Sequence, residues 1–378
     1  MIKLNKAILP AGFKANGVKC GIKKSNKPDL ALFYSTLPAT ASAKFTKNSI
    51  LAAPLKVNKA QLSSGKHFQA VLVNSGNANC FTGKAGMLDA WLTVKKVAKE
   101  LKIADTSVLV NSTGIIGKRL PIARMNNAIP GLVKGLSSAK ATLAQKAMMT
   151  TDTFIKEVSV KFKIAKRTVT VCGVAKGAGM ISPDMATLLC FIFTDAAITK
   201  QALDKALSVA VENSFNCITV DGCMSTNDTA IVLANGAAGN KLIELKDNYA
   251  KFSEALNLVC LDLAKMIVLD AEGASKFIKI NVYAAKSRDE AKKVALAIAN
   301  SDLFKTACFG ENPNFGRIAA AAGASGIKVE EAKLKVKLGP LNKKHIHLSV
   351  GLSRGKASVT VYTCDLTGDY IKINAEYN

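Results

Sequence analysis

The chain has 378 residues, of which 49% are hydrophobic and 21% are charged, and it carries a formal net charge of +25. A chain of this length buries enough surface to fold without disulfides or a structural metal, and it predicts two or three domains. No uninterrupted apolar run is longer than that from Leu188 to Phe193, which is far shorter than the ~20 residues of a membrane-spanning helix. The start of the sequence has no apolar stretch of signal-peptide length, so we expect a cytoplasmic protein.

The cysteine and histidine patterns point away from a disulfide framework or a metal centre. The nine cysteines are scattered and never spaced as Cys-x-x-Cys, so we expect reduced thiols packed as small hydrophobic side chains. His345 and His347 share one face of an alternating segment, as two metal ligands could, but no third ligand follows nearby. A surface strand is the simpler interpretation, and we predict no metal site. With only three histidines, a Ser-His-Asp triad is not expected either.

The excess of positive charge first suggests a nucleic-acid-binding protein, because phosphate contacts supply much of the affinity in that class. However, all but six of the 52 basic residues are lysines, they are spread along the whole chain, and aromatic residues make up only 6%. Bidentate phosphate and base recognition favours arginine, and single-strand binding favours aromatic platforms. We therefore interpret the charge as a solvated, lysine-rich surface, with nucleic-acid binding as an alternative function.

Strand and helix patterns alternate along the chain, which predicts an α/β or α+β fold of layered sheets and helices. Short apolar or β-branched runs predict strands, and apolar residues with a period near 3.6 predict helices. In chain order these are a strand at 71–74, a helix at 85–101, strands at 107–110, 167–175 and 188–194, helices at 198–213 and 249–269, a strand at 275–282, a helix at 288–299, and two or three strands within 334–361. A fresh β-α-β pattern opens near 275–285, which is the sharpest candidate for a domain boundary.

Thr187 is the first catalytic candidate, because an amine close to a threonine hydroxyl can activate it without any histidine. It lies in Lys176-Gly-Ala-Gly-Met-Ile-Ser-Pro-Asp-Met-Ala-Thr187, an irregular loop that ends at a buried strand. If this loop bends the Ala186 carbonyl toward the Thr187 hydroxyl, an N-to-O acyl shift would cleave the chain. The new α-amine, with an ordinary pKa of about 7.7–8.0, would then act as general base for that hydroxyl. Taken alone, an Ala-Thr dipeptide at the start of a strand is usually structural.

Two further segments carry candidate residues. Thr113 and Gly114 follow a strand in Asn111-Ser-Thr-Gly-Ile-Ile-Gly, and successive backbone N–H groups in a turn there would form an oxyanion hole. Glu272 lies in Asp270-Ala-Glu-Gly-Ala, in a loop position between a helix and a strand. Taken alone, the first segment is more simply an ordinary turn, and Glu272 is more simply a solvated glutamate.

Together these segments resemble the ArgJ family, the ornithine (glutamate N-acetyl) acetyltransferases of arginine biosynthesis. The stretch from Lys176 is similar to the family's self-processing motif, Lys-Gly-(Ser/Ala)-Gly-Met-Ile-x-Pro-(Asn/Asp)-Met-Ala-Thr. Other motifs follow the family's order along nearly the whole chain: Gly12-Phe, Asp29-Leu-Ala-Leu, Phe45-Thr-x-Asn, Ala52-Ala-Pro, Asn74-Ser-Gly-Asn-Ala-Asn, Ser112-Thr-Gly-Ile-Ile-Gly, Thr150-Thr-Asp-Thr, Ser214-Phe-Asn, Ile218-Thr-Val-Asp-Gly, Ser225-Thr-Asn-Asp-Thr, Asp270-Ala-Glu-Gly-Ala, Asn312-Pro-Asn-Phe-Gly-Arg and Ile373-Asn-Ala-Glu-Tyr.

The resemblance implies a role for each candidate. Thr187 is the nucleophile, freed by cleavage after Ala186 into chains 1–186 and 187–378, and Thr113 with Gly114 forms the oxyanion hole. The substrate is bound by Thr150 or Thr151, Lys176, Thr187, Glu272 and Asn374. Lys176 suits a substrate carboxylate and Glu272 an amine. Family members usually continue past the final Tyr with Arg and then Thr or Ser, whereas Asn378 stands at the arginine's position here. A truncated chain or a weaker substrate grip would each explain this departure.

The implied activity is transfer of the acetyl group from N2-acetyl-L-ornithine to L-glutamate, through an acetyl-Thr187 ping-pong intermediate. No metal or bound cofactor is implied, and acetyl-CoA is a further candidate substrate. The implied fold is of the α/β class, a layered α/β/β/α sandwich core of the DmpA/ArgJ-like type at 1–278, with a sub-boundary near 196, and a smaller C-terminal α/β domain at 279–378. The implied assembly is an α2β2 heterotetramer without a membrane partner. An amidohydrolase or aminopeptidase of the same fold, which would pass the acyl group from Thr187 to water, is an alternative.

Overall fold

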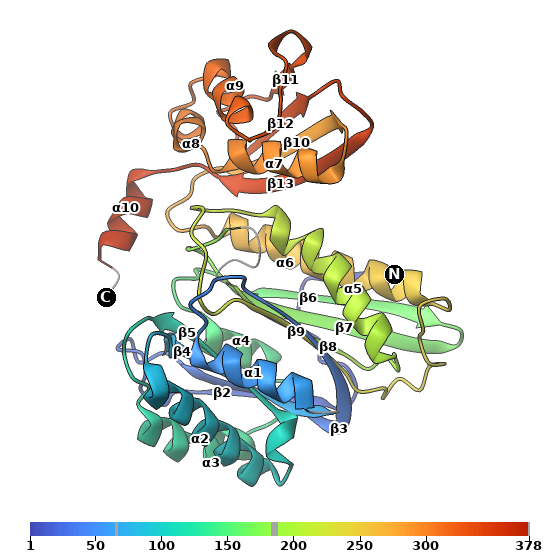
Figure 1. Cartoon of the computed structure of the whole chain (residues 1–378). Coiled ribbons are helices and arrows are strands. Elements are labelled where there is room, and N and C mark those ends of the chain that lie inside the picture. The colour runs from blue at the N-terminus through green and yellow to red at the C-terminus, as the bar shows by residue number, and fades with distance from the viewer. Residues whose placement is uncertain (65–66, 183–187, 377–378) are drawn as a thin grey trace. The chain divides into compact units, whose positions relative to one another are not determined.

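The computed structural model describes residues 1–64, 67–182 and 188–376, and it divides into two compact units (Figure 1). The first unit comprises the described residues within 1–177, 187–214 and 225–263, and the second comprises those within 178–186, 215–224 and 264–378. Both units are therefore discontinuous in sequence. The domain boundary expected from the sequence, between residues 278 and 279, refers to domains that fold independently. It stays a prediction.

The described strands of the first unit form one nine-stranded sheet, in the order β1-β6-β7-β8-β9-β3-β4-β5, with β2 paired to β3. The strands are β1 (Ile2–Leu4), β2 (Phe13–Val18), β3 (Leu30–Phe45), β4 (Phe68–Asn77), β5 (Val108–Ile115), β6 (Lys156–Ile164), β7 (Arg167–Lys176), β8 (Leu189–Thr194) and β9 (Thr229–Ala234). The β4–β5 and β8–β9 pairs are parallel. Parallel neighbours need a crossover connection, which α2 and α5 supply.

β3 joins the two halves of this sheet. Its first part pairs with β2 and β4, its last part from Thr40 pairs with β9, and the register shifts between Tyr34 and Ala39. Pro38 lies in that interval, and a proline donates no ladder hydrogen bond, so the strand can bend there. The two halves share one inner core, where the ring of Phe33 lies 4.9 Å from that of Phe193.

Helices cover the outer face of each half. α1 (Ala53–Ser64), α2 (Gly83–Leu101) and α3 (Ile122–Lys134) pack on the β3–β4–β5 half, and α4 (Ala141–Met148) contributes to the inner core. α5 (Lys200–Glu212) and α6 (Tyr249–Leu269) lie side by side over the other half in Figure 1, and Gly173 of β7 leaves room for Val259 of α6. This arrangement confirms the predicted α/β/β/α sandwich.

Local patterns account for most of these elements. The helix predicted at 198–213 is α5, and the Thr199 hydroxyl caps it by accepting the Ala202 N–H at 3.3 Å. Its buried residues follow a helical period: Ala202, Leu203, Ala206, Leu207, Ala210 and Val211. The prediction that Thr113 and Gly114 form a turn is wrong. β5 continues through Ile115, because it stays paired with β4 as far as Asn77.

The second unit is built on a four-stranded sheet of order β11-β12-β10-β13. Its elements are β10 (Phe277–Ala285), α7 (Arg288–Ala299), α8 (Asp302–Phe309), α9 (Phe315–Gly323), β11 (Lys335–Leu338), β12 (His345–Gly351), β13 (Ala357–Cys364) and α10 (Gly368–Ala375). Residues of α7, α8 and α9 share a core with the apolar side of β10 and β12. His345 and His347 are exposed on β12, as expected for a surface strand. No helix among the described residues is both long and apolar enough to cross a membrane.

Candidate active site

Lys176, the last residue of β7, places a buried ammonium group between two threonines of the first unit. Only 3% of the residue is exposed. Its Nζ donates to Thr150 Oγ1 at 2.7 Å and to Thr113 Oγ1 at 3.4 Å. A buried charge needs polar partners. The hydroxyl of Thr113 is therefore tied to a cation rather than left to rotate.

A fully buried carboxylate, Asp152, organises the same group of residues. Its Oδ1 accepts from Lys156 Nζ at 2.8 Å and from the Gly177 N–H at 2.7 Å, and its Oδ2 accepts from the Thr150 N–H at 3.0 Å. Burial alone would raise the pKa of Asp152, but the positive charges of Lys176 and Lys156 lower it to about 2. We call Thr113, Thr150, Asp152, Lys156 and Lys176 the lysine cluster.

Positive charge extends beyond this cluster to Lys23. Burial lowers the pKa of Lys23 to about 8, with the charge of Lys176 acting in the same direction and that of Asp29 against it. The ammonium groups of Lys23, Lys156 and Lys176 carry one more charge than the carboxylates of Asp29 and Asp152, so this part of the unit has a net positive charge. Such a charge suits a substrate carboxylate.

Gly114 follows Thr113 where β4 and β5 approach each other closely. Its φ is +129°, and a Cβ at this position would lie 2.3 Å from the carbonyl carbon of Gly76. Any side chain would therefore force the two strand ends apart.

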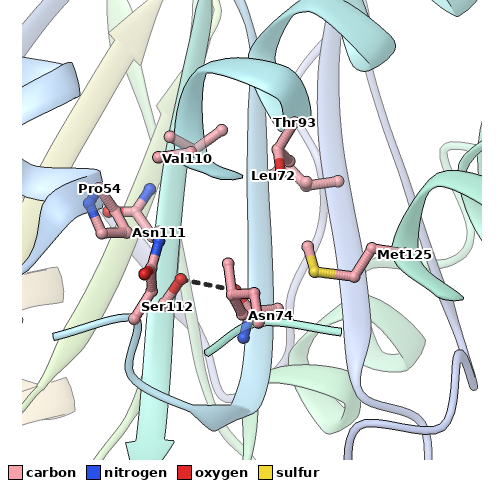
Figure 2. Close-up of a pocket in the computed structure, with 11 residues that line it drawn as sticks. Pro54, Leu72, Asn74, Thr93, Val110, Asn111, Ser112 and Met125 are labelled. Carbon is pink, nitrogen blue, oxygen red and sulfur yellow. Dashed lines mark hydrogen bonds between the residues drawn. The ribbon is translucent and has the colours of Figure 1, made fainter. Parts of the chain in front are cut away.

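A small, mostly apolar cavity lies beside the same two strands (Figure 2). Asn74, Asn111 and Ser112 line it, and the Ser112 hydroxyl donates to Asn74 Oδ1 at 2.6 Å. Its volume is about 10 Å³, which is room for one water molecule. The cavity is too small for an amino acid, so it is not a substrate-binding site.

In the second unit, Glu272 lies in the turn between α6 and β10, as the sequence predicts. Its N–H donates to the Ala178 carbonyl at 3.0 Å, and its Oε2 accepts from Asn374 Nδ2 of α10 at 3.0 Å. A Cβ at Gly179 would lie 2.1 Å from Glu272 Oε2, so a side chain here would displace this carboxylate. The chain just before the predicted cleavage site thus packs directly against this carboxylate.

Asp221 also binds the chain just before the predicted cleavage site. Its carboxylate accepts from the N–H groups of Met180 at 2.6 Å and Ile181 at 3.0 Å, and from the Tyr370 hydroxyl at 3.2 Å. Burial, followed by the Asp221 charge, raises the pKa of Tyr370, so the phenol keeps the proton that it donates. Met180 has a left-handed φ of +56°, a conformation that costs a non-glycine residue energy. Asp221 holds this strained segment in place.

Comparison with known proteins decides the family. The model of the ArgJ family matches residues 14–378. The chain belongs to the ArgJ family. An "Arginine biosynthesis bifunctional protein ArgJ" of Geobacter sulfurreducens is 45% identical over 388 residues, covering 97% of this chain and 98% of that one. A "Glutamate N-acetyltransferase" of Methanococcus maripaludis is 42% identical over 403 residues, covering 98% of this chain and 97% of that one.

Solved structures of ArgJ-family proteins are also similar. An ornithine acetyltransferase of Mycobacterium tuberculosis, solved in complex with ornithine, is 35% identical and has a TM-score of 0.45. The match covers 50% of this chain and 99% of that one. An ArgJ protein of Bacillus halodurans is 37% identical with a TM-score of 0.46, covering 49% of this chain and 97% of that one.

The structure places the residues that the ArgJ resemblance implies in two groups. Thr113, Gly114, Thr150 and Lys176 come together at the strand ends of the first unit, whereas Glu272 and Asn374 are bonded to each other in the second. Of the two adjacent threonines, Thr150 bonds Lys176, and Thr151 is half-buried beside it. Ala186 and Thr187 lie outside the described residues.

Several polar residues around these groups were not singled out from the sequence. Asp152, Asp221, Asn227 and Asp228 all stand in motifs that the family shares, but no role was assigned to them. A signal was present, because Asp228 immediately precedes the apolar run of β9, where a buried carboxylate needs a specific partner. Lys156 carried no such signal, because it begins β6 and looks like one more surface lysine.

Proposed function

We propose that this ArgJ-family enzyme transfers the acetyl group of N2-acetyl-L-ornithine to L-glutamate through an acetyl ester on Thr187. The observation that carries the proposal is the buried Lys176 ammonium bonded to the hydroxyls of Thr150 and Thr113 beside Gly114. This arrangement supplies a cation and oxyanion donors without a histidine or a metal. The nucleophile arises when the chain cleaves itself between Ala186 and Thr187, giving chains 1–186 and 187–378.

The chemistry proceeds in two half-reactions. The Thr187 hydroxyl attacks the acetyl carbon while the α-amine of Thr187 takes its proton, and Thr113 and Gly114 stabilise the oxyanion. The amide C–N bond then breaks, the amine of ornithine leaves with that proton, and acetyl-Thr187 remains. In the second half-reaction, the neutral amine of glutamate attacks the ester carbon and the C–O bond to Thr187 breaks. The proton lost by the amine passes through the α-amine of Thr187 to the threonine oxygen, which restores the hydroxyl and releases N-acetylglutamate.

The charge of each binding residue determines which group of the substrate it contacts. Lys176 and Thr150 bind the substrate carboxylate, because Lys176 is cationic and Lys23 adds to the positive potential. Glu272 and Asn374 bind the side-chain amine of ornithine, because a carboxylate held by an amide donor offers acceptors to an ammonium group. The reaction uses no bound cofactor, and acetyl-CoA is a second acetyl donor at the same Thr187.

The mature chains assemble as an α2β2 heterotetramer in the cytoplasm. The similarity to the Geobacter and Methanococcus proteins over almost their whole lengths supports a role in arginine biosynthesis.

An acceptor-dependence assay tests the function. Purified protein is incubated with N2-acetyl-L-ornithine carrying an isotopically labelled acetyl group, with and without L-glutamate. We expect labelled N-acetylglutamate to form only when glutamate is present, with little labelled acetate in either case. Acetate release at the same rate with or without glutamate would instead establish an amidohydrolase. Replacing the donor with acetyl-CoA shows in the same assay whether both donors are used.

A further inference from the structure

Asn227 and Asp228 form a buried polar pair at the start of β9. Their exposed fractions are 4% and 1%. Both side chains therefore need hydrogen-bonding partners within the protein. Their partners include the Ser112 carbonyl of β5 and the Leu188 N–H, and the proposed function gives the segments around these two groups separate catalytic tasks.

Asn227 binds the oxyanion segment, by which we mean Ser112, Thr113 and Gly114 of β5. Its Nδ2 donates to the Ser112 carbonyl at 2.8 Å and to the Ala78 carbonyl at 2.7 Å, while its Oδ1 accepts from Thr226 Oγ1 at 2.6 Å. β5 stands at one end of the strand order, so its outer edge has no neighbouring strand. The Asn227 amide supplies the missing partner. Because the peptide group is planar, fixing the Ser112 carbonyl also fixes the direction of the Thr113 N–H.

Asp228 binds the residue that follows the nucleophile. Its Oδ1 accepts the Leu188 N–H at 3.1 Å, and the next residue, Thr229, donates its N–H to the Leu188 carbonyl at 3.0 Å. Both backbone groups of Leu188 are thus held by Asp228, just before β9, and by Thr229, the first residue of β9. After cleavage, the bond to Leu188 would be the only covalent attachment of Thr187, and chain ends fray unless they are tied down.

We propose that Asn227 and Asp228 are positioning residues, which hold the oxyanion segment and the first peptide group of the mature second chain in one register. The inference rests on the proposed function, because it assigns a task to Leu188 only if Thr187 is the nucleophile. A shift of about 1 Å between a nucleophile and its oxyanion donors can cost two orders of magnitude in rate. One dipeptide that contacts both segments sets this separation.

The role of Asp228 requires an acceptor oxygen and not a charge. Burial raises the pKa of Asp228 well above its ordinary range, against the opposing effects of the Leu188 N–H, the Thr46 and Ser225 hydroxyls and the charge of Lys176. A neutral side chain with a carbonyl oxygen in the same place would accept the Leu188 N–H equally well.

The first test compares Asp228→Asn with Asp228→Ala. We measure the extent of self-cleavage by intact mass, then kcat and KM for acetyl transfer at a temperature where both variants are folded. We expect Asp228→Asn to keep kcat within about threefold of wild type, and Asp228→Ala to lose about 10- to 100-fold in kcat with KM little changed. Two results would overturn the proposal: an Asp228→Ala variant as fast as wild type, or an Asp228→Asn variant as slow as Asp228→Ala. The second would mean that the carboxyl group acts through its proton or charge.

The second test uses a matched pair of asparagines on either side of β9. Asn235, just after the last residue of this strand, is also buried, and its Nδ2 donates to the Ala11 carbonyl at 2.9 Å. Asn227→Asp and Asn235→Asp therefore remove the same kind of bond, and each faces a carboxylate toward a carbonyl. We expect both to lower Tm, but only Asn227→Asp to reduce kcat, by about 100-fold. Equal losses of kcat in the two variants would show that the effect is general destabilisation.

Self-cleavage and acetyl transfer by the wild-type protein show whether a negative result concerns the positioning role alone or also the proposed function. A wild-type chain that neither cleaves nor transfers acetyl groups overturns both. A wild-type chain that does both, with Asp228→Ala and Asn227→Asp unaffected in kcat, overturns only the positioning role.

Discussion

At the scale of single residues, the lysine cluster depends on one carboxylate. Asp152 is bonded to Lys156, to the Gly177 N–H and to the Thr150 N–H, and no part of its side chain is exposed. Lys156 and Lys176 are almost completely buried with it. Removing one partner from a buried ion pair leaves an uncompensated charge, which costs more than the pair itself contributes.

We therefore predict that Asp152→Asn lowers the free energy of unfolding by about 3 kcal/mol. The control is Asp204→Asn, which breaks the exposed Lys200–Asp204 pair, and it should change stability by less than about 1 kcal/mol. Urea unfolding at neutral pH measures both. Equal effects of the two substitutions would contradict the account of the cluster.

The same carboxylate gives a pH dependence with a definite sign. The pKa of Asp152 in the folded protein is about 2, below its ordinary value of 3.8, so its contribution to stability is present above about pH 4 and is lost as pH falls toward 2. We predict that the stability difference between wild type and Asp152→Asn shrinks over this interval. A difference that stays constant or grows as pH falls would contradict the ionised state of Asp152.

At the scale of elements, the junction of β4 and β5 shapes the oxyanion segment. We predict that Gly114→Ala lowers kcat at least 100-fold, because its Cβ would lie 2.3 Å from Gly76 and push the strand ends apart. The matched control is Gly117→Ala, which has the same left-handed strain, φ +84°, but nothing within 4 Å of its Cβ. Steady-state kinetics of acetyl transfer compare the two. If both variants lose activity equally, backbone strain and not the close approach is responsible.

Whether a helix or strand could be predicted from the sequence depends on how far apart in the chain its contacting residues lie. α5 and α6 follow from apolar periodicity alone, because each buries one continuous stripe. The length of β5 could not be read in this way, because Asn111, Ser112 and Thr113 look like a polar turn, and only pairing with β4 extends the strand through them. The bend of β3 had a local signal in Pro38, but the halves that it joins are set by long-range pairing.

The residues of the candidate site were also hard to predict where their contacts join distant parts of the chain. Thr113 and Gly114 were candidates from their position after a strand, whereas Thr150 and Lys176 were given roles only because their motifs resemble those of a family. Asn227 and Asp228 act through backbone groups of distant segments, with Asn227 bonded to a residue 115 positions away. No local pattern reports a contact of that separation.

At the scale of the whole molecule, the charge of +25 is the feature least explained by the reaction. The lysine cluster accounts for only two of the basic residues. We predict that binding to duplex DNA at physiological salt is no tighter than a Kd of about 1 μM and weakens steeply as salt rises, as for non-specific electrostatic binding. Fluorescence anisotropy with a labelled duplex measures this. A submicromolar Kd that resists salt would support the nucleic-acid alternative.

The claim that Thr187 becomes the nucleophile by self-cleavage is central, and intact mass spectrometry of the purified protein tests it most directly. Wild type should give two chains, 1–186 and 187–378, and N-terminal sequencing of the second should begin at Thr187. Thr187→Ser keeps a hydroxyl and should still cleave, whereas Thr187→Ala should give one uncut chain of 378 residues. An uncut wild-type chain, or cleavage that persists in Thr187→Ala, would contradict the account.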